Sequence, residues 1–195
     1  MKRVKFISMD ISINLNSGEL DHIEACIRKE SWAQKKIYED YYPSMLPLCQ
    51  RYSNNKEDAL DILHEGFIKI SKNISKYQPG TSLSSWIRRI MVNTAIDFYR
   101  KNTRRRTENL DTAYGVSSNN PDSISRLSAE EIMNALQLLS PAYRSVFNLY
   151  VIEGYAHKEI ASILNITEST SRSNLVKARS KLRKILLSKE ITYER

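Results

Sequence analysis

The sequence predicts an all-α protein of two small helical domains joined by a flexible linker, with a helix-turn-helix in the C-terminal domain. Along most of the chain, apolar residues recur three and four positions apart, which is the period of an amphipathic helix. Only 5 glycines and 5 prolines occur in 195 residues, which favours long helices. A stretch rich in Ser, Asn, Asp and Thr separates two such helical regions and indicates a linker.

The N-terminal domain is predicted over residues 21–106, after an extension at residues 1–20. Pro43 and Pro47 interrupt its first helical stretch, so we expect two helices or one kinked helix there, with Pro43 near a first-turn position. We predict that a turn follows at residues 53–55 and a helix at residues 56–74. A break at residues 77–81 then precedes a last helix at residues 82–101.

The linker is predicted at residues 107–127 and the C-terminal domain at residues 128–195. Ser128 and Glu131 form a capping-box pattern at its start. Ser140-Pro141 opens a second helix, because proline is favoured in the first helical position. The remaining elements are predicted to be a short helix, a tight turn and a long helix, at residues 157–164, 165–167 and 168–189.

Composition and charge limit the class of partner. The chain has 30 Lys and Arg against 22 Asp and Glu, a formal net charge of +8, which favours nucleic acid or an anionic membrane surface. No apolar run approaches the roughly 20 residues that cross a bilayer. A signal peptide is not indicated, and the 2 cysteines form no disulfide framework, so we expect a cytoplasmic protein.

The strongest local pattern lies between Glu159 and Ala178 and is typical of a helix-turn-helix, whose second helix enters the DNA major groove. Ala161 is small where two helices cross, and Asn165 tolerates a left-handed turn. We expect the first turns of the second helix to expose residues suited to DNA, and basic residues to follow: Ser169, Ser171, Arg172, Ser173 and then Lys177. The alternative is an ordinary solvated helix face.

A second cluster mixes aromatic and basic residues between Ser84 and Arg106. Aromatic rings stack on unpaired bases at about 1–3 kcal/mol per base, so the cluster indicates single-stranded or locally opened nucleic acid. Core packing explains Trp86 equally well. Asn93 and Asp97 lie four apart on one helix face and offer hydrogen bonds to an extruded base, although either can be a simple surface residue.

A third cluster makes one helix face acidic, because Asp58, Asp61 and Glu65 are spaced three and four apart. A metal-dependent nuclease could use such carboxylates, but no second acidic cluster with a matching base is evident, which favours a solvated or protein-docking face. His22 and Cys26 could face the same way as metal ligands, but they lack a closed four-ligand motif. We therefore expect no catalytic residues, no metal and no cofactor.

In their order and separation, these segments resemble the sigma factors of bacterial RNA polymerase, in the compact two-domain extracytoplasmic-function group. Asp58-Ala59-x-Asp61-Ile62-x-x-Glu65-x-Phe67 is similar to the core-binding helix of the family. The segment from Ser84 to Arg100 is similar to its promoter-melting helix, and the segment from Leu139 to Phe147 with the helix-turn-helix is similar to its C-terminal domain.

The resemblance implies roles for three sets of residues. The first set docks on the clamp helices of the largest polymerase subunit: Asp58, Asp61, Glu65 and Phe67. The second set, with the loop before its helix, opens the −10 element and captures a flipped base: Trp86, Asn93, Asp97 and Arg100. The third set reads the −35 element: Ser169, Ser171, Arg172, Ser173 and Lys177. Three residues depart from the family pattern. His64 stands where the family usually has Gln, Gly66 where it usually has a bulkier residue, and Ser171 where it usually has an apolar residue.

The implied partners are core RNA polymerase, promoter DNA and, as is usual in the family, an anti-sigma factor, with no small-molecule substrate and no membrane insertion. The main alternative is an autonomous helix-turn-helix regulator that binds DNA without polymerase. That alternative explains the last helix but neither the acidic face nor the cluster around Trp86.

Overall fold

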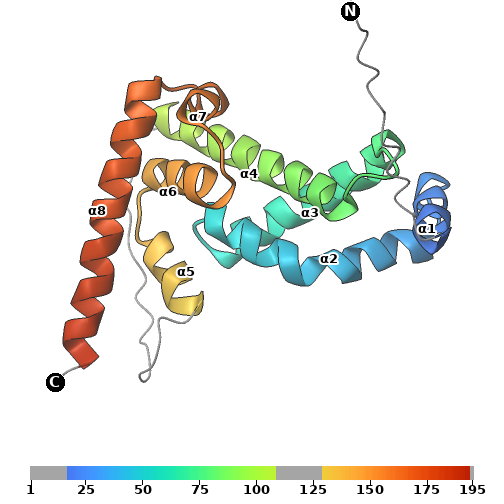
Figure 1. The fold of residues 1–195 in the computed structure, drawn as a ribbon, viewed down its shortest axis with the longest axis horizontal. Coiled ribbons are helices and arrows are strands. Elements are labelled where there is room, and N and C mark those ends of the chain that lie inside the picture. The colour runs from blue at the N-terminus through green and yellow to red at the C-terminus, as the bar shows by residue number, and fades with distance from the viewer. Residues whose placement is uncertain (1–16, 109–128, 194–195) are drawn as a thin grey trace, which may run out of the picture.

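The computed structural model describes residues 17–108 and 129–193, and within them the chain forms helices and no strand, which confirms the predicted all-α class (Figure 1). The helices are α1 (Ser17–Ile27), α2 (Ser31–Tyr52), α3 (Lys56–Asn73), the 3-10 turn η1 (Ile74–Lys76), α4 (Leu83–Glu108), α5 (Ala129–Gln137), α6 (Pro141–Phe147), the π-helical turn η2 (Asn148–Ile152), α7 (His157–Leu164) and α8 (Glu168–Tyr193).

Helix α2 contradicts the expected helix start near Pro43, because it runs unbroken through Pro43 and Pro47. A proline inside a helix removes one backbone donor and leaves a carbonyl group without its usual partner. Both prolines are exposed, so water can hydrate that side of the helix, while Leu48 and Cys49 bury the opposite side. The chain instead turns earlier, between α1 and α2, where Lys29 has a φ of 62°.

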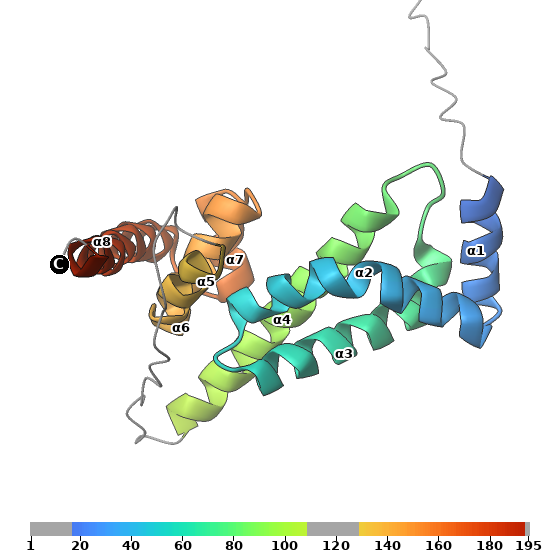
Figure 2. The ribbon, with the colours of Figure 1, turned by 90° about the horizontal axis from the view of Figure 1, so that it is seen from below.

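Helices α2, α3 and α4 pack along one another, and α1 lies across one end of them (Figure 2). Their core contains Ile62, Leu63, Ile87 and Met91, which are fully buried. The predicted turn at residues 53–55 is confirmed: Asn55 is the N-cap residue of α3, and its side chain accepts a hydrogen bond from the Asp58 amide at 2.7 Å.

The predicted helix-turn-helix is formed by α7 and α8. Asn165 ends α7 in the left-handed conformation, with φ 54° and ψ 50°, and α8 begins three residues later. Pro141 opens α6 as expected, and Gly154, with a φ of 78°, follows the π-helical turn. Leu136, Leu139 and Ala178 are buried together where α5 and α8 meet.

The two helical units, α1–α4 and α5–α8, contact each other directly. A single cluster of buried apolar residues extends from α1–α4 into α6, η2, α7 and α8. Of the predicted linker, Thr107 and Glu108 belong to α4, and residues 109–127 lie outside the described residues. The same holds for residues 1–16 and for Ser128 of the capping-box pattern.

Candidate nucleic-acid interface

One face of α4 carries a stripe of exposed polar residues, Arg89, Asn93, Asp97 and Arg100, spaced four, four and three apart. The Asp97 carboxylate accepts a hydrogen bond from Lys69 Nζ of α3 at 3.1 Å and lies 4.0 Å from Arg100 Nη1. Positive groups therefore surround the one acid in this stripe. The structure brings Asn93, Asp97 and Arg100 together as predicted and adds Arg89, which its spacing from Asn93 could have indicated.

Trp86 is half-buried and does not belong to this stripe. Its ring packs edge-on against Tyr77, with 5.7 Å between ring centroids. Burial raises the pKa of Tyr77, and its hydroxyl donates a hydrogen bond to the Thr81 carbonyl and lies 3.3 Å from the Glu19 carboxylate. Trp86 thus helps to hold the loop before α4, which agrees with the packing alternative.

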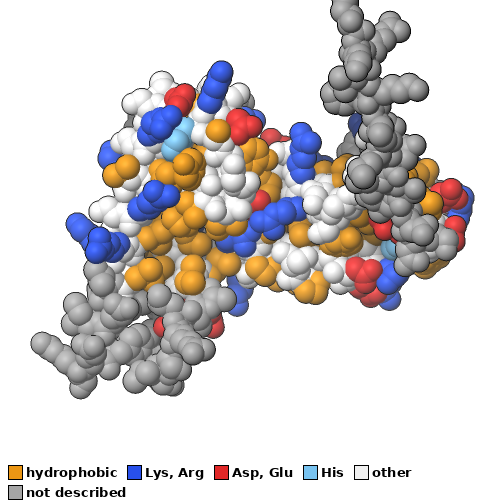
Figure 3. All heavy atoms as spheres, in the orientation of Figure 1, with side chains coloured by type: hydrophobic (Ala, Val, Ile, Leu, Met, Phe, Trp, Pro, Cys, Tyr) orange, Lys and Arg blue, Asp and Glu red, His pale blue; other side chains and the backbone are white. Residues whose placement is uncertain are grey.

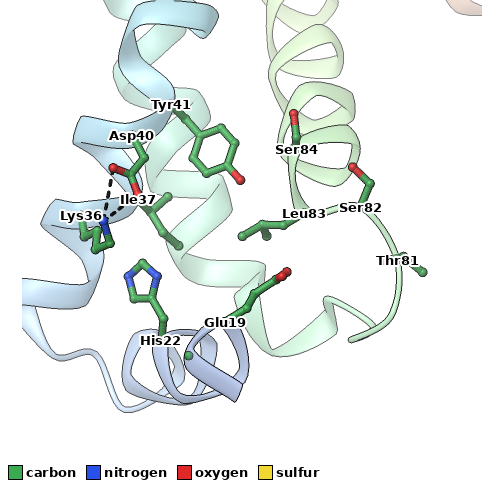
Figure 4. A pocket seen from close by; sticks show the side chains of 11 residues that line it. Glu19, His22, Lys36, Ile37, Asp40, Tyr41, Thr81, Ser82, Leu83 and Ser84 are labelled. Atoms are coloured by element: carbon green, nitrogen blue, oxygen red, sulfur yellow. Dashed lines mark hydrogen bonds and ion pairs between the residues drawn. The ribbon is translucent and has the colours of Figure 1, made fainter. Parts of the chain in front are cut away.

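A pocket of about 450 Å³ opens beside that loop, between α1, α2 and the start of α4 (Figure 4). Its apolar wall contains Ile37 and Leu83, and the Tyr41 ring stands at its edge. Polar and charged groups complete the lining: Glu19, His22, Lys36, Asp40, Thr81, Ser82 and Ser84. Flat rings with polar edges fit such a mixed lining, because they need both stacking surface and hydrogen-bond partners.

The outer face of α8 is basic near its start. Ser169, Arg172, Ser173 and Lys177 are exposed, as predicted. Glu168 accepts two hydrogen bonds from the Arg172 guanidinium, at 3.2 and 2.5 Å. An exposed pair of this kind is worth at most about 1 kcal/mol, so Arg172 can exchange it for a DNA contact. Val176, an apolar side chain on this helix, is 67% exposed and was missed from the sequence.

Ser171 contradicts the prediction that it is exposed in the first turns of α8. Its side chain is fully buried on the inner face of α8, in line with Leu175 and Ala178. Positions 171, 175 and 178 are four and three apart, so they share the face that packs against α6 and α7. The sequence-based prediction of which residues are exposed at the start of α8 was therefore wrong at Ser171.

The predicted acidic face of α3 divides into two parts. Asp61 and Glu65 are exposed, and the exposed apolar residues Leu60 and Ile68 lie on the same helix. Asp58 is half-buried in the first turn. Phe67 is also half-buried, because its ring packs against Tyr38 of α2 with 4.7 Å between centroids. The exposed part of α3 thus combines carboxylates with apolar side chains, a combination suited to a protein partner.

Comparison with known proteins identifies the family of this chain. Residues 37–105 match the model of Sigma-70 region 2, and residues 129–182 match that of Sigma-70 region 4. The chain is 30% identical over 145 residues to the ECF RNA polymerase sigma factor EcfG of Rhodopseudomonas palustris, covering 74% of this chain and 80% of EcfG. It is 30% identical over 151 residues to the sigma factor SigV of Bacillus subtilis, covering 77% and 89%. The chain belongs to the extracytoplasmic-function group of RNA polymerase sigma factors.

Two further similarities agree with this assignment. The ECF RNA polymerase sigma factor SigE of Mycolicibacterium smegmatis is 36% identical over 145 residues, which cover 71% of this chain and 56% of SigE. The fold matches that of the sigma factor RpoE of Bartonella quintana, solved in complex with the anti-sigma factor NepR. That match has a TM-score of 0.51 and 20% identity, and it covers 78% of this chain and 95% of RpoE.

Two of the residues at which this sigma factor departs from the family pattern, Gly66 and Ser171, each contact a specific side chain from another helix. Gly66 lies where α3 crosses α4, and a β-carbon there would overlap the side chain of Met91, with 2.8 Å to its Cε. Met91 therefore occupies the space that a larger residue at position 66 would need. Ser171 is matched by His157, whose Nδ1 lies 2.9 Å from the Ser171 hydroxyl oxygen. His64 is exposed on α3 and changes only the surface.

Charged residues join the two units of the sigma factor near the start of α4. Arg88 donates from Nε and Nη2 to the Glu153 carboxylate at 3.0 and 2.9 Å, and Arg51 Nη2 lies 3.6 Å from the same group. Burial lowers the pKa of Arg51, while Glu153 raises it. Helix α4 also contacts α7. The packing of the C-terminal unit thus covers part of the predicted promoter-melting helix.

A second buried arginine joins the units near α3. Arg144 of α6 is 2% exposed, and it donates hydrogen bonds to Asn54 and to the Gln137 side chain, at 2.5 and 2.7 Å. Burial lowers its pKa to about 10, and Asp58 opposes this shift, so the guanidinium stays charged near neutral pH. The predicted docking residue Asp58 therefore lies beside this contact in the free protein.

The remaining surface features concern charge and possible ligands. In Figure 3, Lys and Arg side chains are prominent around α7 and α8, and apolar side chains gather over the region of α5 and α6. Within residues 17–108 and 129–193, no group of three or more His, Cys, Asp or Glu residues could hold a metal ion. The same residues include no helix that could span a membrane.

Proposed function

We propose that this sigma factor uses three separate helix faces: α3 for core RNA polymerase, α4 for promoter opening and α8 for reading the −35 element. One observation supports this division above all. Between Glu57 and Ile68, the exposed side chains of α3 are acidic or apolar apart from His64, whereas the exposed stripe of α4 and the start of α8 are mainly basic and polar. Opposite chemistry on separate helices suits a protein that stands between DNA and polymerase.

On α3, Asp61 and Glu65 are the proposed contacts to polymerase, with Leu60 and Ile68 supplying apolar area beside them. Asp58 and Phe67 have a supporting role in this proposal, since Asp58 lies beside Arg144 and Phe67 packs on Tyr38. Charged rims steer association and apolar centres supply most of the affinity.

On α4, Asn93, Asp97 and Arg100 are the proposed contacts to the opened −10 element, with Arg89 beside them. Trp86 acts through Tyr77, by holding the loop that borders the pocket. Unstacking a base costs a few kcal/mol, and a fitted pocket can offset that cost. The mixed lining of the pocket supports its use for a flipped base.

On α8, Ser169, Arg172, Ser173 and Lys177 are the proposed contacts to the −35 element. Arginine can donate two hydrogen bonds to a guanine edge, and serine and lysine can contact phosphates near the helix start. Val176 adds an apolar contact of the kind that a thymine methyl group accepts. Ser171 is left out of this set because its side chain is buried.

The proposal extends to the domains, the compartment and the partners. The unit predicted at residues 21–106, extended by the remainder of α1 and α4 to residues 17–108, binds polymerase and melts DNA, and the unit predicted at residues 128–195 reads DNA. The chain works in the cytoplasm and contributes sequence choice and strand opening, while polymerase carries out the chemistry. An anti-sigma factor is the proposed regulator, as in the complex of RpoE with NepR.

The test is a charge reversal on α3. We expect Asp61→Arg with Glu65→Arg to abolish binding to purified core RNA polymerase and to leave the fold intact, because both residues are exposed. The matched control is Asp21→Arg with Glu24→Arg, an equal change in charge at two exposed positions of α1. Unchanged polymerase affinity of the α3 variant would refute the docking assignment. Sequence-specific DNA binding by the wild-type chain, with no binding to core RNA polymerase, would favour the autonomous regulator.

A further inference from the structure

His157, the first residue of α7, connects three elements around the helix-turn-helix. Its Nδ1 lies 2.9 Å from the Ser171 hydroxyl oxygen in the first turns of α8. Its ring stacks on Tyr150 of η2, with 4.4 Å between centroids and 20° between the planes. Arg179, two turns further along α8, places its guanidinium carbon 5.9 Å from the centroid of the same Tyr150 ring. Ser171 and Arg179, about two turns apart on α8, thus contact α7 and η2 through His157 and Tyr150.

The contact between His157 and Ser171 restricts the position of α8 relative to α7 more than an apolar contact would. Ser171 is fully buried between Leu175, Ala178 and the preceding helices, and a buried hydroxyl without a hydrogen bond is unfavourable. The serine side chain is short, so the imidazole can satisfy it only from a narrow range of positions. The stack on Tyr150 sets the plane of the ring at the same time.

Residues on either side of Ser171 face outward. Thr170 and Arg172 are exposed, so a shift or rotation that moves Ser171 also moves them relative to DNA. Side chains that recognise a ligand must be held to about 0.5 Å by the residues behind them. We propose that His157 is a positioning residue for sequence recognition, which acts through Ser171 and Tyr150 to set the orientation of the first turns of α8.

This inference rests on the proposed function of α8 in reading DNA, and it assigns His157 no contact with a base. Burial and the neighbouring Arg172 lower the pKa of His157, so its ring is neutral near pH 7. Replacing it by a neutral residue therefore changes little in the charge that DNA meets. The expected effect is a loss of discrimination between sequences, without a change in the salt dependence of binding.

Four variants separate positioning from stability. His157→Ala removes both the hydrogen bond and the stack. His157→Asn keeps an amide group near the place of Nδ1. His157→Ala combined with Ser171→Ala also removes the buried hydroxyl, which recovers stability but restores no link between the helices. Ser162→Ala, an exposed change on the same helix α7, is the matched control.

The experiment uses holoenzyme assembled from the full chain and core RNA polymerase. A duplex DNA library with a random segment is first enriched on the wild-type holoenzyme. The selected duplex and a scrambled duplex of equal composition are then the two probes for every variant. The measured quantity is the ratio of the two dissociation constants at several salt concentrations, together with the thermal midpoint of each free protein.

We expect His157→Ala to reduce this ratio at least fivefold, with little change in binding to the scrambled duplex and an unchanged salt slope. His157→Asn should retain most of the ratio, and Ser162→Ala all of it. The double variant should regain thermal stability and still discriminate poorly. Discrimination that returns together with stability, an equal loss on both duplexes, or a ratio within twofold of wild type for His157→Ala would overturn the inference. A wild-type holoenzyme that enriches no sequence would instead refute the proposed function.

Discussion

Glu153 offers the sharpest test of how the two units of this sigma factor hold together. Its carboxylate is 6% exposed, accepts two hydrogen bonds from Arg88 and lies 3.6 Å from Arg51. Replacing it by alanine leaves two arginines without this acid. Arg51 suffers most, because its side chain is only 16% exposed and its buried Nε has no hydrogen-bond partner.

The size of the effect follows from the burial of each partner. Removing one member of a fully buried ion pair costs about 3–5 kcal/mol, since it leaves an uncompensated charge. The Arg88 side chain is 40% exposed and regains water, so its share is reduced. We therefore expect Glu153→Ala to lower the free energy of unfolding by about 2–4 kcal/mol. Glu153→Gln keeps the shape and one acceptor, so its cost should be smaller.

Urea unfolding followed by circular dichroism measures this change. The control is Glu39→Gln, which removes an exposed pair with Lys35 at 3.6 Å and should cost at most about 0.5 kcal/mol. Small-angle scattering adds an independent measurement, because Glu153→Lys places three positive side chains together and should increase the radius of gyration. A Glu153→Ala variant within about 0.5 kcal/mol of the control would refute the reasoning, since the ion pair would then contribute no more than a surface pair.

Three further predictions concern packing, DNA and pH. Gly66→Ala should destabilise the protein by no more than about 1 kcal/mol, because the new methyl group displaces the flexible end of the buried Met91 side chain while the higher helix propensity of alanine offsets about 1 kcal/mol of that cost, and a double-mutant cycle with Met91→Ala should show that the two changes are not additive. Arg172→Ala should weaken binding to the selected promoter more than to scrambled DNA; an equal loss on both, with a salt slope reduced by about 1, would make Arg172 a phosphate contact. The pKa of His157 is lowered by burial and by Arg172 and Arg179, against Glu168, so the unfolded state binds a proton first and stability should fall as pH drops below about 6.5. Urea midpoints should show that His157→Asn loses part of this dependence.

Several parts of the fold and site could be predicted because they depend on neighbours in the sequence. The helical period, the left-handed Asn165 and the start of α6 at Pro141 are local properties, and all three were correct. The exposed acids of α3 and the exposed stripe of α4 also follow from helical spacing alone. The same reasoning failed at Ser171, because the register of α8 against α6 and α7 decides which residues it buries.

The helical class, the order of the elements and the chemistry of each helix face can be predicted from the sequence, since they depend on contacts within a few residues. The tertiary packing is needed to show that α2 continues through two exposed prolines, that Ser171 pairs with His157, and that Met91 fills the space beside Gly66. The same packing brings Glu153 to Arg88 across 65 positions of sequence. Such contacts bring together residues from distant helices, and no local periodicity encodes which of them will meet.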